Sequence, residues 1–66
     1  MNHDTLIRHL SDYATTMLKD LGTEHGRRYL RGCIPVWRDA YGEDVARQMG
    51  QIIKAKLEQR RAHQDA

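Results

Sequence analysis

The chain has 66 residues and a formal net charge of +2, and its acidic and basic residues are interspersed, so charge alone does not demand a nucleic acid partner. A chain this short makes one domain, and its folding buries only about 60% of the surface that the unfolded chain exposes. The lone Cys33 excludes an internal disulfide. Because there is no secretory h-region and no apolar run long enough to cross a membrane, we expect a cytoplasmic protein without membrane contact.

The first segment carries the clearest helical pattern of the chain. Its apolar residues recur at spacings of one, three and four and form one broad stripe: Leu6, Ile7, Leu10, Tyr13, Ala14, Met17, Leu18 and Leu21. The side chain of Asn2 or Asp4 can cap the start of this helix, and Gly22 supplies the left-handed residue that ends one. We therefore predict a helix over about residues 4–21.

The second segment has helical spacing but contains a proline. Thr23 is placed to cap it, and its apolar residues are Leu30, Cys33, Ile34, Trp37 and Tyr41. Pro35 removes one backbone hydrogen bond and clashes with the carbonyl group four residues earlier, so we expect a kink or a break near residues 32–34. The pattern fits two short helices, over about residues 24–33 and 35–41, as well as one bent helix.

The third segment follows Gly42 and opens with Glu43 and Asp44, whose charge favours a helix N-terminus. A helix over about residues 43–61 is predicted from the spacing of Val45, Met49, Ile52, Ile53 and Leu57. Residues 62–66 are polar and without pattern, and we expect them to fray. The sequence thus predicts an all-α fold, a small bundle of three to four helices in a single domain over residues 1–66.

A resemblance covers about half of the chain. It is carried by Arg27-Arg28-Tyr29-Leu30, Cys33-Ile34-Pro35, Arg38, Tyr41-Gly42, Ala46 and Ile52-Ile53. In this order of residues the chain resembles small uncharacterised helical proteins of proteobacteria and their prophages. The resemblance implies a bacterial or phage accessory protein, and it implies no activity that can be carried over to individual residues.

Arginine and aromatic residues concentrate in the second segment. Both types are enriched where proteins bind one another, and the candidate partner-binding residues are Arg27, Arg28, Arg31, Trp37, Arg38 and Tyr41. Guanidinium groups suit carboxylates on a protein or phosphates on a nucleic acid. The alternative is a solvated arginine face with pairs to Asp20 or Glu24, and a tryptophan that simply fills the core.

Small residues recur every fourth position in the third segment, at Gly42, Ala46 and Gly50. Such a row lets another helix approach closely. A glycine inside a helix costs about 1 kcal/mol relative to alanine, so Gly50 should have a packing reason. The sequence leaves open whether this row, together with Ile53, packs on the first helix or on a second copy or partner helix.

We expect a protein-binding module that is not an enzyme, and self-association into a homodimer is one way to stabilise so small a core. Many phage accessory proteins inhibit or redirect a host regulator or a defence complex, and we expect this chain to inhibit or modulate a partner of that kind. A DNA-binding regulator is an alternative, with Gly22 and Thr23 as the turn of a helix-turn-helix, although Glu43 and Asp44 would repel phosphate. A second alternative is a structural subunit of a larger assembly.

The sequence offers no convergent catalytic or metal-binding set. Cys33 has only His25 near it, two helical turns away, so a buried structural cysteine is the better interpretation. The histidines lack the paired spacing of a helical zinc site. Met1-Asn2-His3 could chelate copper or nickel through a free amine, but chance explains that order better. We expect no metal and no cofactor.

Overall fold

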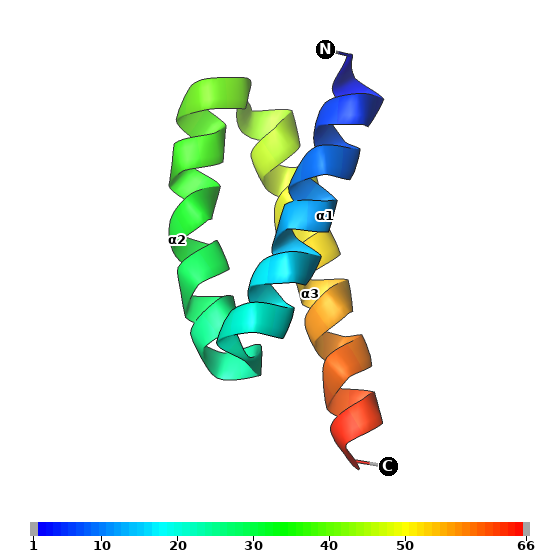
Figure 1. The fold of residues 1–66 in the computed structure, drawn as a ribbon. Coiled ribbons are helices and arrows are strands. Elements are labelled where there is room, and N and C mark those ends of the chain that lie inside the picture. The colour runs from blue at the N-terminus through cyan, green and yellow to red at the C-terminus, as the bar shows by residue number, and fades with distance from the viewer. Residues whose placement is uncertain (1, 66) are drawn as a thin grey trace.

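The computed structural model describes residues 2–65, with the side chains of residues 2–62. Over this range it contains three α-helices, α1 (His3–Leu21), α2 (Thr23–Tyr41) and α3 (Glu43–Asp65), and no strand. Each helix runs roughly antiparallel to the next, so that α1 begins at one end of the molecule and α3 finishes at the other (Figure 1). The predicted all-α fold is confirmed, with three helices rather than four.

The helices are joined by single glycines. Gly22 (φ +85°) is the whole connection between α1 and α2, and Gly42 (φ +104°) is the whole connection between α2 and α3. Side chains other than hydrogen rarely fit this backbone region, so each turn requires its glycine. Two antiparallel helices joined in this way form a tight hairpin, unlike the three- to four-residue turn and steep crossing of a helix-turn-helix.

The start of α1 is capped as the sequence predicts, but the start of α2 is not. The Oδ1 atom of Asn2 accepts a hydrogen bond of 2.8 Å from the backbone N–H of Thr5. At α2 the N-cap position belongs to Gly22, and Thr23 is already the first helical residue. The hydroxyl of Thr23 instead accepts a hydrogen bond of 3.1 Å from Nε of Arg60, which ties α3 to the start of α2.

Helix α2 passes through Pro35 without a break, so of the two predicted alternatives the single helix is correct and the division into helices over residues 24–33 and 35–41 is not. The proline removes one backbone hydrogen bond, the one to the carbonyl group of Arg31. Both residues are exposed, so water can solvate that carbonyl group. Leu30 and Trp37, on either side of the proline, are buried. Anchoring on both sides therefore outweighs the local tendency to end the helix.

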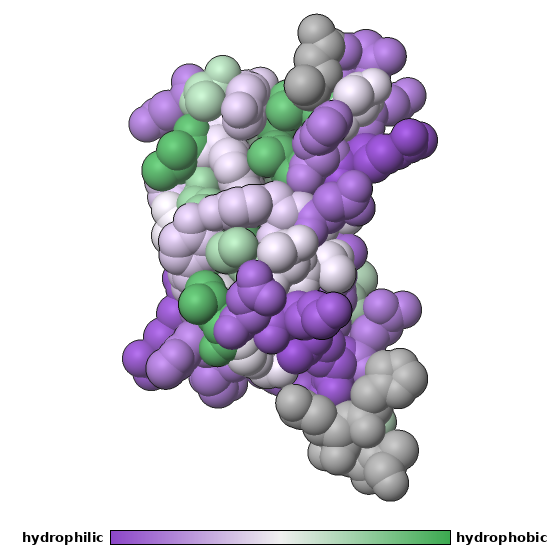
Figure 2. All heavy atoms as spheres, viewed as in Figure 1, coloured by the Kyte–Doolittle hydropathy of each residue, from purple (hydrophilic) through white to green (hydrophobic). Residues whose placement is uncertain are grey.

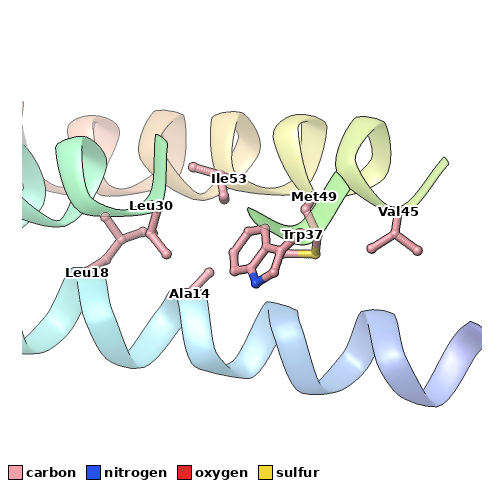
Figure 3. Close-up of a cluster of buried hydrophobic side chains, with 7 residues drawn as sticks. All are labelled: Ala14, Leu18, Leu30, Trp37, Val45, Met49 and Ile53. Carbon is pink, nitrogen blue, oxygen red and sulfur yellow. The ribbon is translucent and has the colours of Figure 1, made fainter. Parts of the chain in front are cut away.

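All three helices contribute to the core, which runs along the bundle. The buried apolar residues are Ala14 and Leu18 of α1, Leu30 and Trp37 of α2, and Val45, Ala46, Met49 and Ile53 of α3. Figure 3 shows the indole ring of Trp37 between Ala14 and Met49. Only 7% of Trp37 is exposed, so it fills the core rather than anchoring a partner at the surface.

The close approach between helices lies at Gly26, a position the sequence did not single out for packing. A Cβ atom there would lie 2.9 Å from both the Cα and the Cδ2 atoms of Leu18 on α1. At Gly50 a Cβ atom would meet nothing within 4 Å. The predicted row therefore does not act as one packing surface: Gly42 precedes α3, Ala46 is buried in the core and Gly50 is exposed.

Helix α3 is the longest of the three and continues past the turn between α1 and α2 (Figure 1). Its last helical residue is Asp65, beyond the end expected near residue 61, and residue 66 lies outside the described residues. In the described range, every helix is too short or too polar to cross a membrane.

Candidate protein-binding groove

A groove of about 620 Å³ runs between α2 and α3. Its floor is apolar and consists of Ile34 and Pro35 from α2 with Ile53 and Leu57 from α3. Ile53 is buried, while Ile34 and Leu57 are partly buried and also pack on the core. Gly50 lines the same groove and leaves space above the backbone of α3. The floor is thus a shallow extension of the core that is open to solvent.

The rim of this groove is strongly basic. Among the residues whose side chains the structure describes, Arg27 and Arg31 of α2 and Lys54 and Arg61 of α3 line it, against a single carboxylate, that of Glu58. These five residues carry a net charge of +3, whereas the whole chain carries +2, so the rest of the molecule sums to −1. The small positive charge of the chain is therefore concentrated at one place, which the composition does not reveal.

Arg27 is only partly satisfied. Its Nη2 atom lies 3.3 Å from Oε2 of Glu24, one turn earlier on α2. Its Nε atom is buried, and no acceptor among the described residues lies within hydrogen-bonding distance. A buried donor without a partner costs about 1–3 kcal/mol, so this guanidinium favours an additional acceptor. Neither Arg31 nor Lys54 forms an ion pair with any described residue.

The structure separates the six residues that the sequence grouped as a partner-binding cluster. Arg27 and Arg31 line the groove and Trp37 is in the core. Nε of Arg38 lies 2.8 Å from Oε2 of Glu43, across the turn at Gly42. Tyr41 is 48% exposed at the end of α2, and Arg28 is exposed outside the groove.

Several groove residues were not singled out as a site from the sequence. Leu57 and Glu58 each lie three or four positions from both Lys54 and Arg61, so the four residues share one face of α3, and that signal was present in the sequence. Which face of α2 they meet depends on how the two helices are rotated about their axes. From the predicted row of small residues, Gly50 and Ile53 belong to this groove.

A second groove, of about 580 Å³, lies between α1 and α2. The hydroxyl groups of Tyr13 and Tyr29 form a hydrogen bond there, and the rings of Tyr13 and Trp37 make a T-shaped contact at a centroid distance of 6.5 Å and an angle of 78°. Burial raises the pKa of the neighbouring Cys33 thiol, so this cysteine is a poor nucleophile at neutral pH. Within residues 2–62, no three potential metal ligands cluster.

Comparison of the chain with models of protein families, with curated proteins and with solved structures found no match.

Proposed function

We propose that this chain is a protein-binding module whose α2–α3 groove holds an acidic, amphipathic helix of another protein. One observation carries the proposal: an apolar floor between two helices is bordered, over residues 2–62, by four cationic side chains and one carboxylate. Apolar floors provide binding free energy by removing surface from water, and a charged rim selects the partner and speeds its encounter.

A helix suits this groove better than a strand or an extended peptide. The groove runs between two neighbouring antiparallel helices, the position that a fourth helix occupies in a four-helix bundle. Residues of the partner at spacings of three and four would contact Ile34, Ile53 and Leu57. The absence of a side chain at Gly50 lets the backbone of the partner come close, which gives this exposed helical glycine a function.

The charges select an acidic helix. Carboxylates along the edges of the partner helix would meet Arg31, Lys54 and Arg61. The resemblance implies an accessory protein. By binding a helix of a host regulator or of a defence complex, such a protein would inhibit or modulate it.

A defined probe tests the groove directly. The probe is a stapled helical peptide with leucines at positions i, i+3, i+4 and i+7, flanked by glutamates, titrated into the ¹⁵N-labelled chain. Amide signals around Gly50 and Leu57 should shift, and a peptide of the same apolar pattern with lysines should bind far more weakly. Equal binding of the two peptides would contradict the proposal.

Charge reversal provides the matched variants. The double variant Arg31→Glu, Lys54→Glu should bind the acidic peptide roughly tenfold more weakly or worse, because like charges then face each other. Arg47→Glu makes the same change at an exposed α3 position outside the groove and should leave binding unchanged. Duplex DNA serves as the competing ligand: tight binding that falls steeply with salt would favour the DNA-binding alternative.

A further inference from the structure

The face formed by α1 and α2 carries exposed apolar side chains. Among residues 2–62, the exposed large apolar residues all belong to these two helices, and three of them line the α1–α2 groove: Tyr13, Tyr29 and Val36, which are 37%, 44% and 63% exposed. In Figure 2, hydrophobic and weakly polar residues lie over the middle of α2 and the gap between α1 and α2, with strongly hydrophilic side chains at the ends of α2 and along α1. This face is apolar in the middle and polar at its edges.

The groove on this face contains almost no charge. Among the described residues that line it, His9 is the only one with an ionisable side chain besides the two tyrosines and Cys33. The hydroxyl groups of Tyr13 and Tyr29 already bond to each other, and Tyr29 stays neutral far above physiological pH because its pKa is raised to about 12. Burying the centre of this surface therefore takes no charged group out of water. Desolvation of charged groups is the most costly step in burying a polar surface.

A two-fold dimer places the same surface on both sides of the interface. The α2–α3 groove cannot do this, because its cationic rim would face a second cationic rim. The α1–α2 face can, and the residues at its two edges complement each other. Asp12 on α1 and Arg28 on α2 each directly precede one of the two hydrogen-bonded tyrosines, and both are exposed.

Helical geometry places Asp12 of one copy opposite Arg28 of the other in such a dimer. Each residue is rotated by about 100° from the next, so Asp12 and Arg28 are displaced from their tyrosines by the same angle, toward the outer edges of the face. A two-fold axis along the helices sets α1 of one copy against α2 of the other, with Asp12 at the height of Arg28. Lys19 and Glu24, further along the same edges, are also opposite in sign.

We propose that a second copy of this chain covers the α1–α2 face, about a two-fold axis that runs along the helices, with Asp12 of each copy opposite Arg28 of the other. The central contact is made by Tyr13, Tyr29 and Val36. This dimer leaves the α2–α3 groove free, so it is independent of the proposed function.

Sedimentation equilibrium of the full chain over a range of concentrations tests the proposal. The wild-type chain should reach the mass of a dimer, and Val36→Glu should remain a monomer with unchanged helical circular dichroism. Lys54→Glu, in the other groove, should dimerise like the wild type. A wild-type chain that stays monomeric throughout, or a Val36→Glu variant that still dimerises, would overturn the proposal.

A charge swap tests the orientation of the two copies. Arg28→Glu alone and Asp12→Lys alone should each weaken the dimer roughly tenfold, because each places like charges opposite one another. The double variant Asp12→Lys, Arg28→Glu should restore the wild-type dissociation constant. A double variant as weak as the two single changes combined would show that these residues do not face each other. All three variants alter exposed side chains, so their folding can be confirmed by circular dichroism.

Discussion

The glycines of this chain have different structural roles, and the residue type alone does not tell a turn glycine from a packing glycine or an exposed one. Gly22 and Gly42 have positive φ angles, Gly26 has Leu18 of α1 against its backbone, and Gly50 has open space around it. A spacing of four drew attention to Gly50 in the sequence, whereas the tight contact is at Gly26. No local pattern marks Gly26, because its role depends on which residue of α1 lies opposite.

Alanine substitutions should therefore have opposite effects at two of these glycines. Gly26→Ala forces a Cβ atom against the backbone of Leu18 and should lower the free energy of unfolding by about 1–3 kcal/mol. Gly50→Ala adds a methyl group in open space and should raise it by up to about 1 kcal/mol. Urea denaturation followed by circular dichroism measures both. Stabilisation by Gly26→Ala would show that the two helices can separate at little cost.

Tyr29 makes the stability of the fold sensitive to alkaline pH. Its hydrogen bond with Tyr13 is the main cause that raises its pKa to about 12, whereas tyrosines in the unfolded chain ionise near pH 10. The folded chain thus holds this proton more tightly. The resulting stabilisation is complete below about pH 10 and is lost as the pH rises from about 10 to 12.

Tyr13→Phe tests the cause of this shift. Without the hydroxyl of Tyr13, the pKa of Tyr29 should move back toward its ordinary value, and ultraviolet absorbance of the tyrosinate band reports it. Tyr41→Phe removes a distant exposed hydroxyl and is the control. An unchanged high-pH transition in Tyr13→Phe would mean that the interhelical hydrogen bond is not its cause.

At the scale of the helices, apolar spacing predicted the position of every element and local rules failed where packing competes with them. Asn2 and Gly22 mark the ends of α1 because capping depends only on neighbouring residues. The rule that proline ends a helix failed at Pro35, since Leu30 and Trp37 hold α2 against the core on both sides. The α2–α3 groove could not be predicted, because it exists only where faces of two helices meet.

Pro35→Ala should stabilise the chain. The alanine restores the backbone N–H group that the carbonyl group of Arg31 lacks, and proline inside a helix costs about 3 kcal/mol relative to alanine in a peptide. A gain of about 1–2 kcal/mol is expected in thermal or urea unfolding, because the present helix has already adapted to the ring. A loss of stability would indicate that the ring of Pro35 makes stabilising contacts with the other residues of the groove floor.

For the whole molecule, a core of so few side chains gives only a small free energy of unfolding. A domain of this length has a free energy of unfolding of roughly 3–10 kcal/mol. Leu30 and Met49 are fully buried and Leu18 is nearly so. Each of them therefore accounts for a large part of the total stability, and a second copy or a bound partner would add to it by mass action.

Leu30→Ala should cost about 2–5 kcal/mol and leave much of the chain unfolded at room temperature. Leu21→Ala, at a position that is 44% exposed, removes the same atoms and should cost far less. Circular dichroism at two protein concentrations measures both effects. If dimerisation stabilises the fold, the melting temperature of the wild type should rise with concentration.

The two single-glycine turns also bear on how quickly this chain reaches its fold. Helices that follow one another in sequence lie side by side, so closing each turn costs little chain entropy, and bundles dominated by such local contacts fold within microseconds to milliseconds. Trp37 is the only tryptophan and lies where all three helices meet, so its fluorescence reports the arrival of the last helix. Lengthening either turn should slow that step, even where it leaves the final structure intact.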